Sequence, residues 1–237
     1  MSAMRLACSM PVIRPECPQF FTATNLWWKP LLKDDAHKEI VISSLRFLVE
    51  KKRISMHAFV LMPNHIHLIA VPSLESGLAR GIGEAHRRYS RMINFREGWR
   101  GFLWQGRFFS CLLDQNHLLA AVRYVERNSV RAGLTDTPWE YPWSSALAHC
   151  QNQTDGLVQV EPLLSLVSGS WQDFLQRENH KVEVENFRLH ARTGRPLGND
   201  HFLDQIEQRL GRTIRPGKPG PKPKTRLLDQ EPSSSCV

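Results

Sequence analysis

Two apolar runs on either side of a Pro-Asn pair constrain the fold of this chain more than any other feature. The runs cover residues 56–62 and 65–71, and Pro63 and Asn64 lie between them. Each run has the length of a strand, and proline followed by asparagine is typical of a turn. The sequence therefore predicts two strands that meet at a tight bend or bulge.

Strand and helix patterns alternate along the rest of the first 150 residues. Short β-branched and aromatic runs predict strands, whereas apolar residues at helical spacing predict helices. The further elements are a strand at 18–25, helices at 34–49 and 74–95, a loop or short strand at 98–106, a strand at 108–113 and a helix at 114–131. This order predicts an α+β fold in which helices pack on a mainly antiparallel sheet.

The helix at 114–131 has the clearest pattern in the chain. Asp114 can cap its first turn, and Gly133 follows its last turn as a stop. Leu118, Val122 and Val125 recur at helical spacing and should form its buried stripe.

The composition changes after residue 150. We expect a main unit at 18–150, an unassigned extension at 1–17 and an accessory segment at 151–211 with a helix from Asn199 to Leu210. Residues 212–226 carry six basic residues, four prolines and no acidic residue. Such a composition predicts that 212–237 form a disordered basic tail.

The charge and the cysteines exclude several classes of protein. The 237 residues include 31 Lys and Arg against 23 Asp and Glu, and the net charge of +8 favours a polyanionic partner. The five cysteines are scattered, without the C-x-x-C pair of a zinc knuckle or redox motif. No apolar run has the length of a signal peptide or a membrane helix. We therefore expect a cytoplasmic protein with no membrane partner.

His65 and His67 are two residues apart in a strand pattern. Because strand side chains alternate between faces, both imidazoles should point to the same side and can share one metal ion. In the simpler interpretation, one histidine is buried and hydrogen-bonded and the other is exposed. The turn next to the pair favours a site, since sites are often built where strands end.

Tyr124 and Asn128 are four residues apart in the predicted helix, so a phenol and an amide oxygen should share one of its faces. Without the histidine pair, a partly buried tyrosine beside a capping asparagine would be the preferred interpretation. The other tyrosines are Tyr89, which lies among arginines and suits base stacking, and Tyr141, which lies between prolines and tryptophans and suits packing. Tyr124 is therefore the candidate nucleophile, and Asn128 the candidate third metal ligand.

Cleavage of a phosphodiester by tyrosine needs a cation, because a phenol with a pKa near 10 is mostly protonated at neutral pH. Two imidazoles and an amide oxygen leave positions open for phosphate oxygens. This set suits Mg²⁺ or Mn²⁺, although imidazoles also accept zinc or nickel.

Residues 87–107 carry arginines interleaved with aromatic residues, and one acid, Glu97. Basic groups neutralise backbone phosphates and aromatic rings stack on unpaired bases, so this segment predicts nucleic-acid binding. A solvated helix face next to core aromatics is the other interpretation. The candidate DNA-binding residues, with three lysines of the tail, are Arg87, Arg88, Tyr89, Arg91, Arg96, Arg100, Arg107, Lys218, Lys222 and Lys224.

Five motifs in this order resemble the REP-associated tyrosine transposases, which belong to the HUH single-tyrosine (IS200-like) transposases. They are Phe59-Val-Leu-Met-Pro-Asn-His-Ile-His-Leu-Ile69, Arg88-Tyr-Ser-Arg-Met-Ile-Asn94, Leu103-Trp-Gln-Gly-Arg-Phe108, Arg123-Tyr-Val-Glu-Arg-Asn-Ser-Val-Arg-Ala-Gly133 and Pro142-Trp-Ser-Ser145. The resemblance runs from about Phe20 to the tail. The chain departs from the family at Ser129, where the family usually has proline.

The resemblance implies a ferredoxin-like catalytic domain at 18–150, with His65 and His67 as the metal-binding pair and Asn128 as a further ligand. It implies that Tyr124 attacks single-stranded DNA next to hairpins of the repetitive extragenic palindrome type. The attack would form a 5′-phosphotyrosine and free a 3′-hydroxyl. We expect a monomer or homodimer, associated with the nucleoid of a bacterium. Two alternatives stay open, a non-catalytic protein that binds structured DNA and a metal-dependent RNA endonuclease.

Overall fold

The structure, a computed structural model, describes residues 17–215 except 25–31, 33, 52, 74 and 105–107. Residues 1–16 of the predicted N-terminal extension lie outside the described residues, as does the predicted tail from residue 216 onward.

A four-stranded antiparallel sheet forms the centre of the molecule. Its strands are β1 (Gln19–Thr24), β2 (Ile54–Leu61), β3 (His65–Pro72) and β4 (Phe109–Leu112), in the spatial order β2-β3-β1-β4. Helix α1 (Asp35–Glu50) connects β1 to β2, and α2 (Glu75–Glu97) connects β3 to β4. This β-α-β-β-α-β arrangement is the ferredoxin-like topology, so the predicted α+β fold is confirmed.

The bend between β2 and β3 fixes the register of the sheet. The backbone N–H of Met62 donates to the carbonyl oxygen of His65 at 2.9 Å and closes the turn at Pro63 and Asn64. A register shift between Met56 and Ala58 marks a bulge further along β2. The predicted tight bend is therefore present, next to the start of β3.

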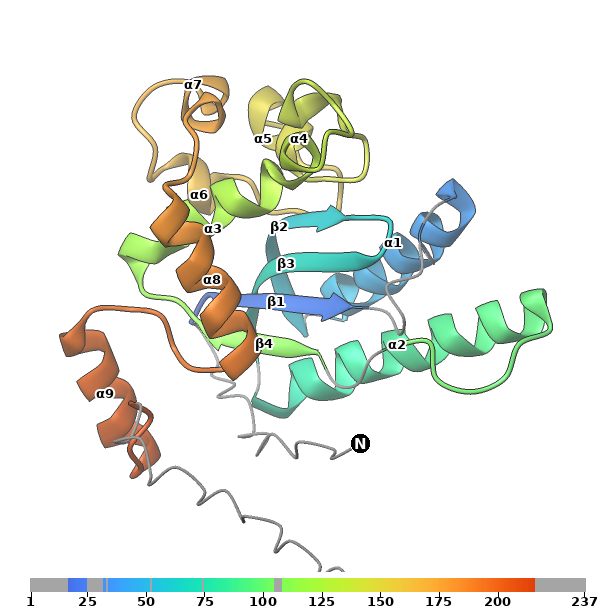
Figure 1. Ribbon diagram of the computed structural model, residues 1–237, viewed down its shortest axis with the longest axis horizontal. Helices are drawn as coiled ribbons and strands as arrows, with labels where there is room; N and C mark the ends of the chain where they lie inside the picture. Colours follow the sequence, from blue (N-terminus) through green and yellow to red (C-terminus); the bar gives the residue numbers. More distant parts are fainter. Residues whose placement is uncertain are drawn as a thin grey trace, which may run out of the picture.

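Helices cover both faces of the sheet (Figure 1). Phe21, Ile66 and Leu68 turn toward α1 and α2 and belong to one core. Phe20 and Ile69, on the other face, pack against α3 (Gln115–Glu126) in a second core. Because neighbouring residues of a strand alternate between faces, His65 and His67 lie on the second face, with α3.

The C-terminal half completes this second core rather than standing apart from it. It contains α4 (Asn128–Arg131), a short 3₁₀ helix (Pro138–Glu140), α5 (Ala146–Gln151), α6 (Glu161–Leu164), α7 (Trp171–Gln176), α8 (Lys181–Thr193) and α9 (Asp200–Leu210). Trp171 and Phe187 are buried there, and Leu157 is buried in the first core. The segment expected to be an accessory one, 151–211, thus shares both cores, and α8 lies across β1 and β4 (Figure 1).

The predicted helix at 114–131 forms as two helices, α3 and α4, with an interruption at Arg127. Asp114 caps α3 by accepting from the backbone N–H of His117 at 2.8 Å, and Gly133 has a positive φ of 66° after α4. In the described part of the chain, no helix combines the length and the apolar character that a bilayer crossing requires.

Candidate active site

His65 and His67 lie side by side on β3, where the strand follows the bend. Their ring centroids are 4.6 Å apart, and His67 faces Thr22 of β1 in the sheet register. Because the two residues are separated by one position in a strand, their side chains share the face that α3 covers. The two imidazoles are therefore close enough to act on one ligand.

Helix α3 places Tyr124 against this pair. The Tyr124 ring centroid is 5.5 Å from that of His67 and 5.5 Å from that of Phe187 on α8. Phe20 of β1 contacts the Tyr124 ring edge-on at 6.1 Å. Tyr124 is 5% exposed, so its ring is held from several sides and its orientation is fixed.

A cavity of about 260 Å³ opens at these side chains. It lies between the sheet, α3 and α8, and is the hollow that His67 and Tyr124 share. The lining residues are Phe20, Thr22, His67, Phe109, Tyr124, Phe187, Arg188, Ala191 and Arg192. None of these is acidic, so the cavity suits an anion.

The imidazoles are held in the neutral form that binds metals. Burial, with a contribution from Arg131, lowers the pKa of His65 to about 4. Burial also lowers the pKa of His67 well below its usual value, helped by the neighbouring charges of His65, Arg131 and Arg188. Both rings are therefore uncharged at neutral pH, as metal coordination requires.

The hydrogen bonds of the two rings also suit a metal. Nδ1 of His65 lies 2.7 Å from Oδ1 of Asn64; if Nδ1 donates this bond, Nε2 keeps its lone pair for a ligand. Nδ1 of His67 is buried and has no hydrogen-bond partner in the part of the chain that the structure describes. A buried nitrogen without a partner costs free energy unless a ligand satisfies it.

The structure does not bring Asn128 to the cavity. This residue is buried at the start of α4, after the interruption at Arg127, and it does not line the cavity with Tyr124. The described residues contain no group of three His, Cys, Asp or Glu side chains that could hold a metal ion. The role of Asn128 as the third metal ligand stays a prediction.

Arg131 lies against the candidate nucleophile, a contact that the sequence patterns did not predict. Its guanidinium is 4.2 Å from the centre of the Tyr124 ring and donates to the Tyr124 carbonyl oxygen at 3.1 Å. Arg131 lies seven residues after Tyr124, two helical turns on, and this spacing could have indicated the contact.

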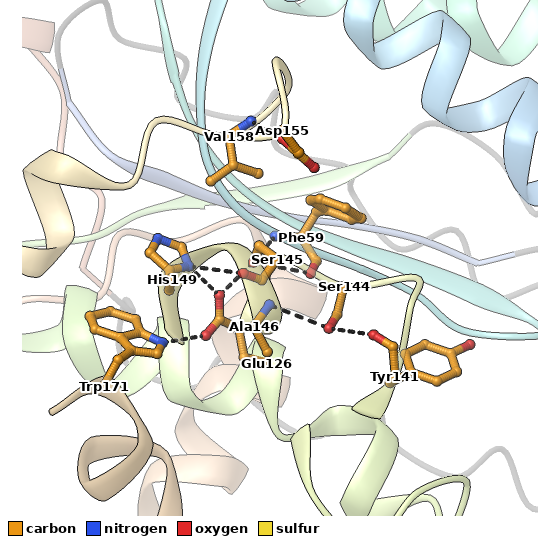
Figure 2. Close-up of polar contacts among 10 residues, drawn as sticks. All are labelled: Phe59, Glu126, Tyr141, Ser144, Ser145, Ala146, His149, Asp155, Val158 and Trp171. Carbon is orange, nitrogen blue, oxygen red and sulfur yellow. Dashed lines mark hydrogen bonds and ion pairs between the residues drawn. The ribbon is translucent and has the colours of Figure 1, made fainter. Parts of the chain in front are cut away.

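A buried polar cluster holds the opposite side of α3 (Figure 2). Glu126 accepts from Nε1 of Trp171 at 2.8 Å and from the Ser145 hydroxyl at 2.5 Å, and Nδ1 of His149 lies 2.7 Å from its Oε1. Ser145 also accepts from the backbone N–H of Phe59 on β2 at 3.0 Å. Glu126 and His149 have fully buried side chains. The cluster therefore ties the helix that carries Tyr124 to β2, α5 and α7.

The other two tyrosines are poorly placed for attack. Tyr89 is 1% exposed and packs against Trp104 at 5.4 Å, so the base-stacking role expected for it is wrong. Burial, with the charge of Asp34, raises the pKa of Tyr89. Tyr141 donates its hydroxyl to the carbonyl oxygen of Leu61 at 2.7 Å, and burial, with Asp35, raises its pKa to about 12.

The basic stretch on α2 and in the loop after it is exposed, but some of its charges are already paired. Arg87 and Arg88 both bind Glu84, and Arg96 binds Glu97. Arg91 and Arg100 are exposed and make no ion pair with a described residue. The exposed rings nearby are Phe95 (90%), Trp99 (45%) and Phe102 (91%). Four predicted DNA contacts lie outside the described residues, namely Arg107, Lys218, Lys222 and Lys224.

Comparison with known families bears directly on this site. Residues 28–128 match the family model described as "Transposase IS200 like". Over this range the chain is similar to the IS200-like transposases. The match spans His65, His67, Tyr124 and Asn128, so all four predicted active-site residues lie within the matched range. The predicted resemblance to the IS200-like transposases is thereby confirmed.

Two solved structures show weaker similarities to this chain. A REP-associated tyrosine transposase bound to a REP hairpin has 18% identity and a TM-score of 0.48, over 76% of this chain and 99% of the other. A protein assigned as a transposase, from Deinococcus radiodurans R1, has 16% identity and a TM-score of 0.35, over 46% and 88%. No curated protein matches. Neither structural similarity is close enough to support an argument about function.

Proposed function

We propose that this protein is a metal-dependent transposase that nicks and rejoins single-stranded DNA next to hairpins, with Tyr124 as its nucleophile. The observation that carries the proposal is the shared cavity, in which the Tyr124 ring lies 5.5 Å from the His67 ring. The motifs shared with REP-associated tyrosine transposases lead us to propose hairpins of that type as the substrate.

The reaction that suits these residues is a transesterification. The Tyr124 oxygen forms a bond to phosphorus, and the bond between phosphorus and the 3′ oxygen breaks. The proton that the phenol loses is balanced by the proton that the leaving 3′ oxygen gains. The product is a 5′-phosphotyrosine with a free 3′-hydroxyl, and the reverse reaction rejoins the strand.

His65 and His67 are the residues that would hold the metal, together with Asn128 if this amide reaches the ion. A bound Mg²⁺ or Mn²⁺ would polarise the phosphate and offset its developing charge. The neutral imidazoles and the unpartnered Nδ1 of His67 support this assignment. The protein itself holds the Tyr124 phenol next to the histidine pair, in a largely buried site.

The histidine pair can be tested without measuring cleavage. Replacing His65 or His67 with Ala should weaken Mn²⁺ binding by about tenfold or more, since the site would lose one of its two imidazoles. Electron paramagnetic resonance of free Mn²⁺ measures this directly. His201→Ala is the matched control, because His201 is an exposed histidine on α9. Equal Mn²⁺ affinity in all three variants and the wild type would contradict the metal site.

We further propose that the exposed end of α2 and the loop that follows it bind the DNA strand beyond the cavity. Arg91 and Arg100 supply unpaired charges, and Phe95 and Phe102 supply exposed rings for unpaired bases. Changing both arginines to Gln should lower the slope of log affinity against log salt by about 0.7 for each phosphate that is no longer neutralised. Fluorescence anisotropy with a single-stranded oligonucleotide measures the slope. An unchanged slope would show that these arginines are only solvated.

The alternative is a protein that binds structured DNA without cutting it. It would bind the hairpin oligonucleotide through α2 in the absence of metal and would form no covalent adduct in its presence. The RNA endonuclease alternative predicts cleavage of RNA hairpins at least as efficient as that of DNA hairpins. Parallel assays on both nucleic acids with Mg²⁺ or Mn²⁺ separate the three functions.

A further inference from the structure

Two arginines of helix α8, Arg188 and Arg192, line the cavity that Tyr124 also lines. Phe187 and Ala191, four residues apart, are buried against the second core and fix the face of α8 that points inward. Arg188 and Arg192 follow these anchors by one residue each and line the cavity beside them. The helix ends at Gly194, which has a positive φ of 69°. The two guanidinium groups are therefore attached to a packed helix rather than to a loose loop.

Among the described residues that line the cavity, the charged side chains are all positive. Neither Arg188 nor Arg192 forms an ion pair with a described residue, and both are exposed at the cavity rim. Arg131 adds a third guanidinium, which lies 4.2 Å from the centre of the Tyr124 ring.

The three arginines repel one another, and the effect appears at the most buried of them, Arg131. Burial is the largest cause of the lowered pKa of Arg131, and the charge of Arg188 lowers it further. Positive charges that lack an acidic partner destabilise each other, so an anion that enters the cavity would relieve them.

We infer that Arg188 and Arg192 bind the phosphodiester that Tyr124 attacks. The inference rests on the proposed function in taking Tyr124 as the nucleophile, and it adds the residues that hold the substrate's phosphate there. A guanidinium presents a planar fork of donors that matches phosphate oxygens, and charge placed beside the phosphate stabilises the transition state of its transfer. No Asp or Glu is among the described residues that line the cavity, so no carboxylate competes with the phosphate for these arginines.

The test separates substrate binding from cleavage. Binding is measured by fluorescence anisotropy with a labelled single-stranded oligonucleotide that carries a hairpin, in a Tyr124→Phe background that cannot form an adduct. Single-turnover adduct formation is measured with Mn²⁺ in the Tyr124 background. The variants are Arg188→Gln, Arg192→Gln and the double change. Lys181→Gln is the matched control, because it removes one positive charge from the far end of the same helix.

The double variant should bind at least tenfold more weakly and form adduct at least tenfold more slowly at saturating DNA, while Lys181→Gln stays within twofold of the unaltered protein. Arg188→Lys with Arg192→Lys should restore most of the binding but not the rate, because lysine keeps the charge and loses the fork. Affinity and rate of the double variant within twofold of Lys181→Gln would overturn the inference. If the wild type binds through these arginines but forms no adduct, the proposed function fails and the phosphate site stands.

Discussion

Tyr124→Phe should abolish the covalent adduct between protein and DNA while the protein stays folded. The change removes one oxygen, and the ring keeps its packing against Phe20, His67 and Phe187. The hydroxyl also interacts with the Arg131 side chain, and losing this interaction should lower the unfolding free energy by roughly 1 kcal/mol or less. Denaturing gel electrophoresis after incubation with hairpin DNA and Mn²⁺ measures the adduct, and anisotropy measures the retained binding.

Tyr89→Phe is the control for this experiment. Tyr89 lies on the other face of the sheet, with α1 and α2, so its hydroxyl cannot take part in a reaction at the cavity. Its variant should form as much adduct as the wild type. An adduct that survives in Tyr124→Phe and disappears in Tyr89→Phe would mean that α3 does not carry the nucleophile.

Glu126→Ala should be the most destabilising single change in the site region. The carboxyl group accepts from Trp171 and Ser145 and contacts His149, and all of these groups are buried (Figure 2). Removing it leaves the buried donors without an acceptor and breaks a buried pair, at a cost of about 3–5 kcal/mol. Chemical denaturation measures this loss. Because α3 loses its attachment to α5 and α7, adduct formation at Tyr124 should fall too.

Two further variants identify the cause of that loss. Glu126→Gln keeps one acceptor oxygen and should lose less, about 1–3 kcal/mol. Glu178→Ala removes an exposed carboxylate that pairs with Arg127 at 3.3 Å, and should cost about 1 kcal/mol or less. If Glu126→Ala were as stable as Glu178→Ala, the buried cluster would not hold the helix.

The sheet and its helices follow from local pattern. The Pro63-Asn64 bend, the alternation in β3 and the cap at Asp114 each depend on residues close together in the sequence. The four strands of the sheet form as predicted, whereas the helix predicted at 114–131 is divided into α3 and α4. The stacking role predicted for Tyr89 is wrong because this ring lies on the buried face of α2, whereas its arginine neighbours lie on the exposed face. Its spacing from Ile82 and Ile93, seven and four residues, already marks the buried face.

The rest of the site depends on contacts between distant segments. Arg188 and Arg192 lie more than sixty residues after Tyr124, on a helix whose packing on β1 and β4 no local pattern reveals. Glu126 resembles an ordinary exposed acid of an amphipathic helix until Trp171, Ser145 and His149 are seen to surround it. Such long-range packing decides burial, and sequence periodicity alone does not.

Mapping the site of the covalent link tests the central claim most directly. The wild-type protein is incubated with hairpin-flanked single-stranded DNA and Mn²⁺, treated with nuclease and trypsin, and analysed by tandem mass spectrometry. Arg123 and Arg127 flank the tyrosine, so the modified residue should lie in the short peptide 124–127. We predict a nucleotide linked to Tyr124 through a 5′ phosphate, formed only when metal is present. A nucleotide on Tyr89 or Tyr141, or no linked nucleotide although the DNA is cut, would contradict the account.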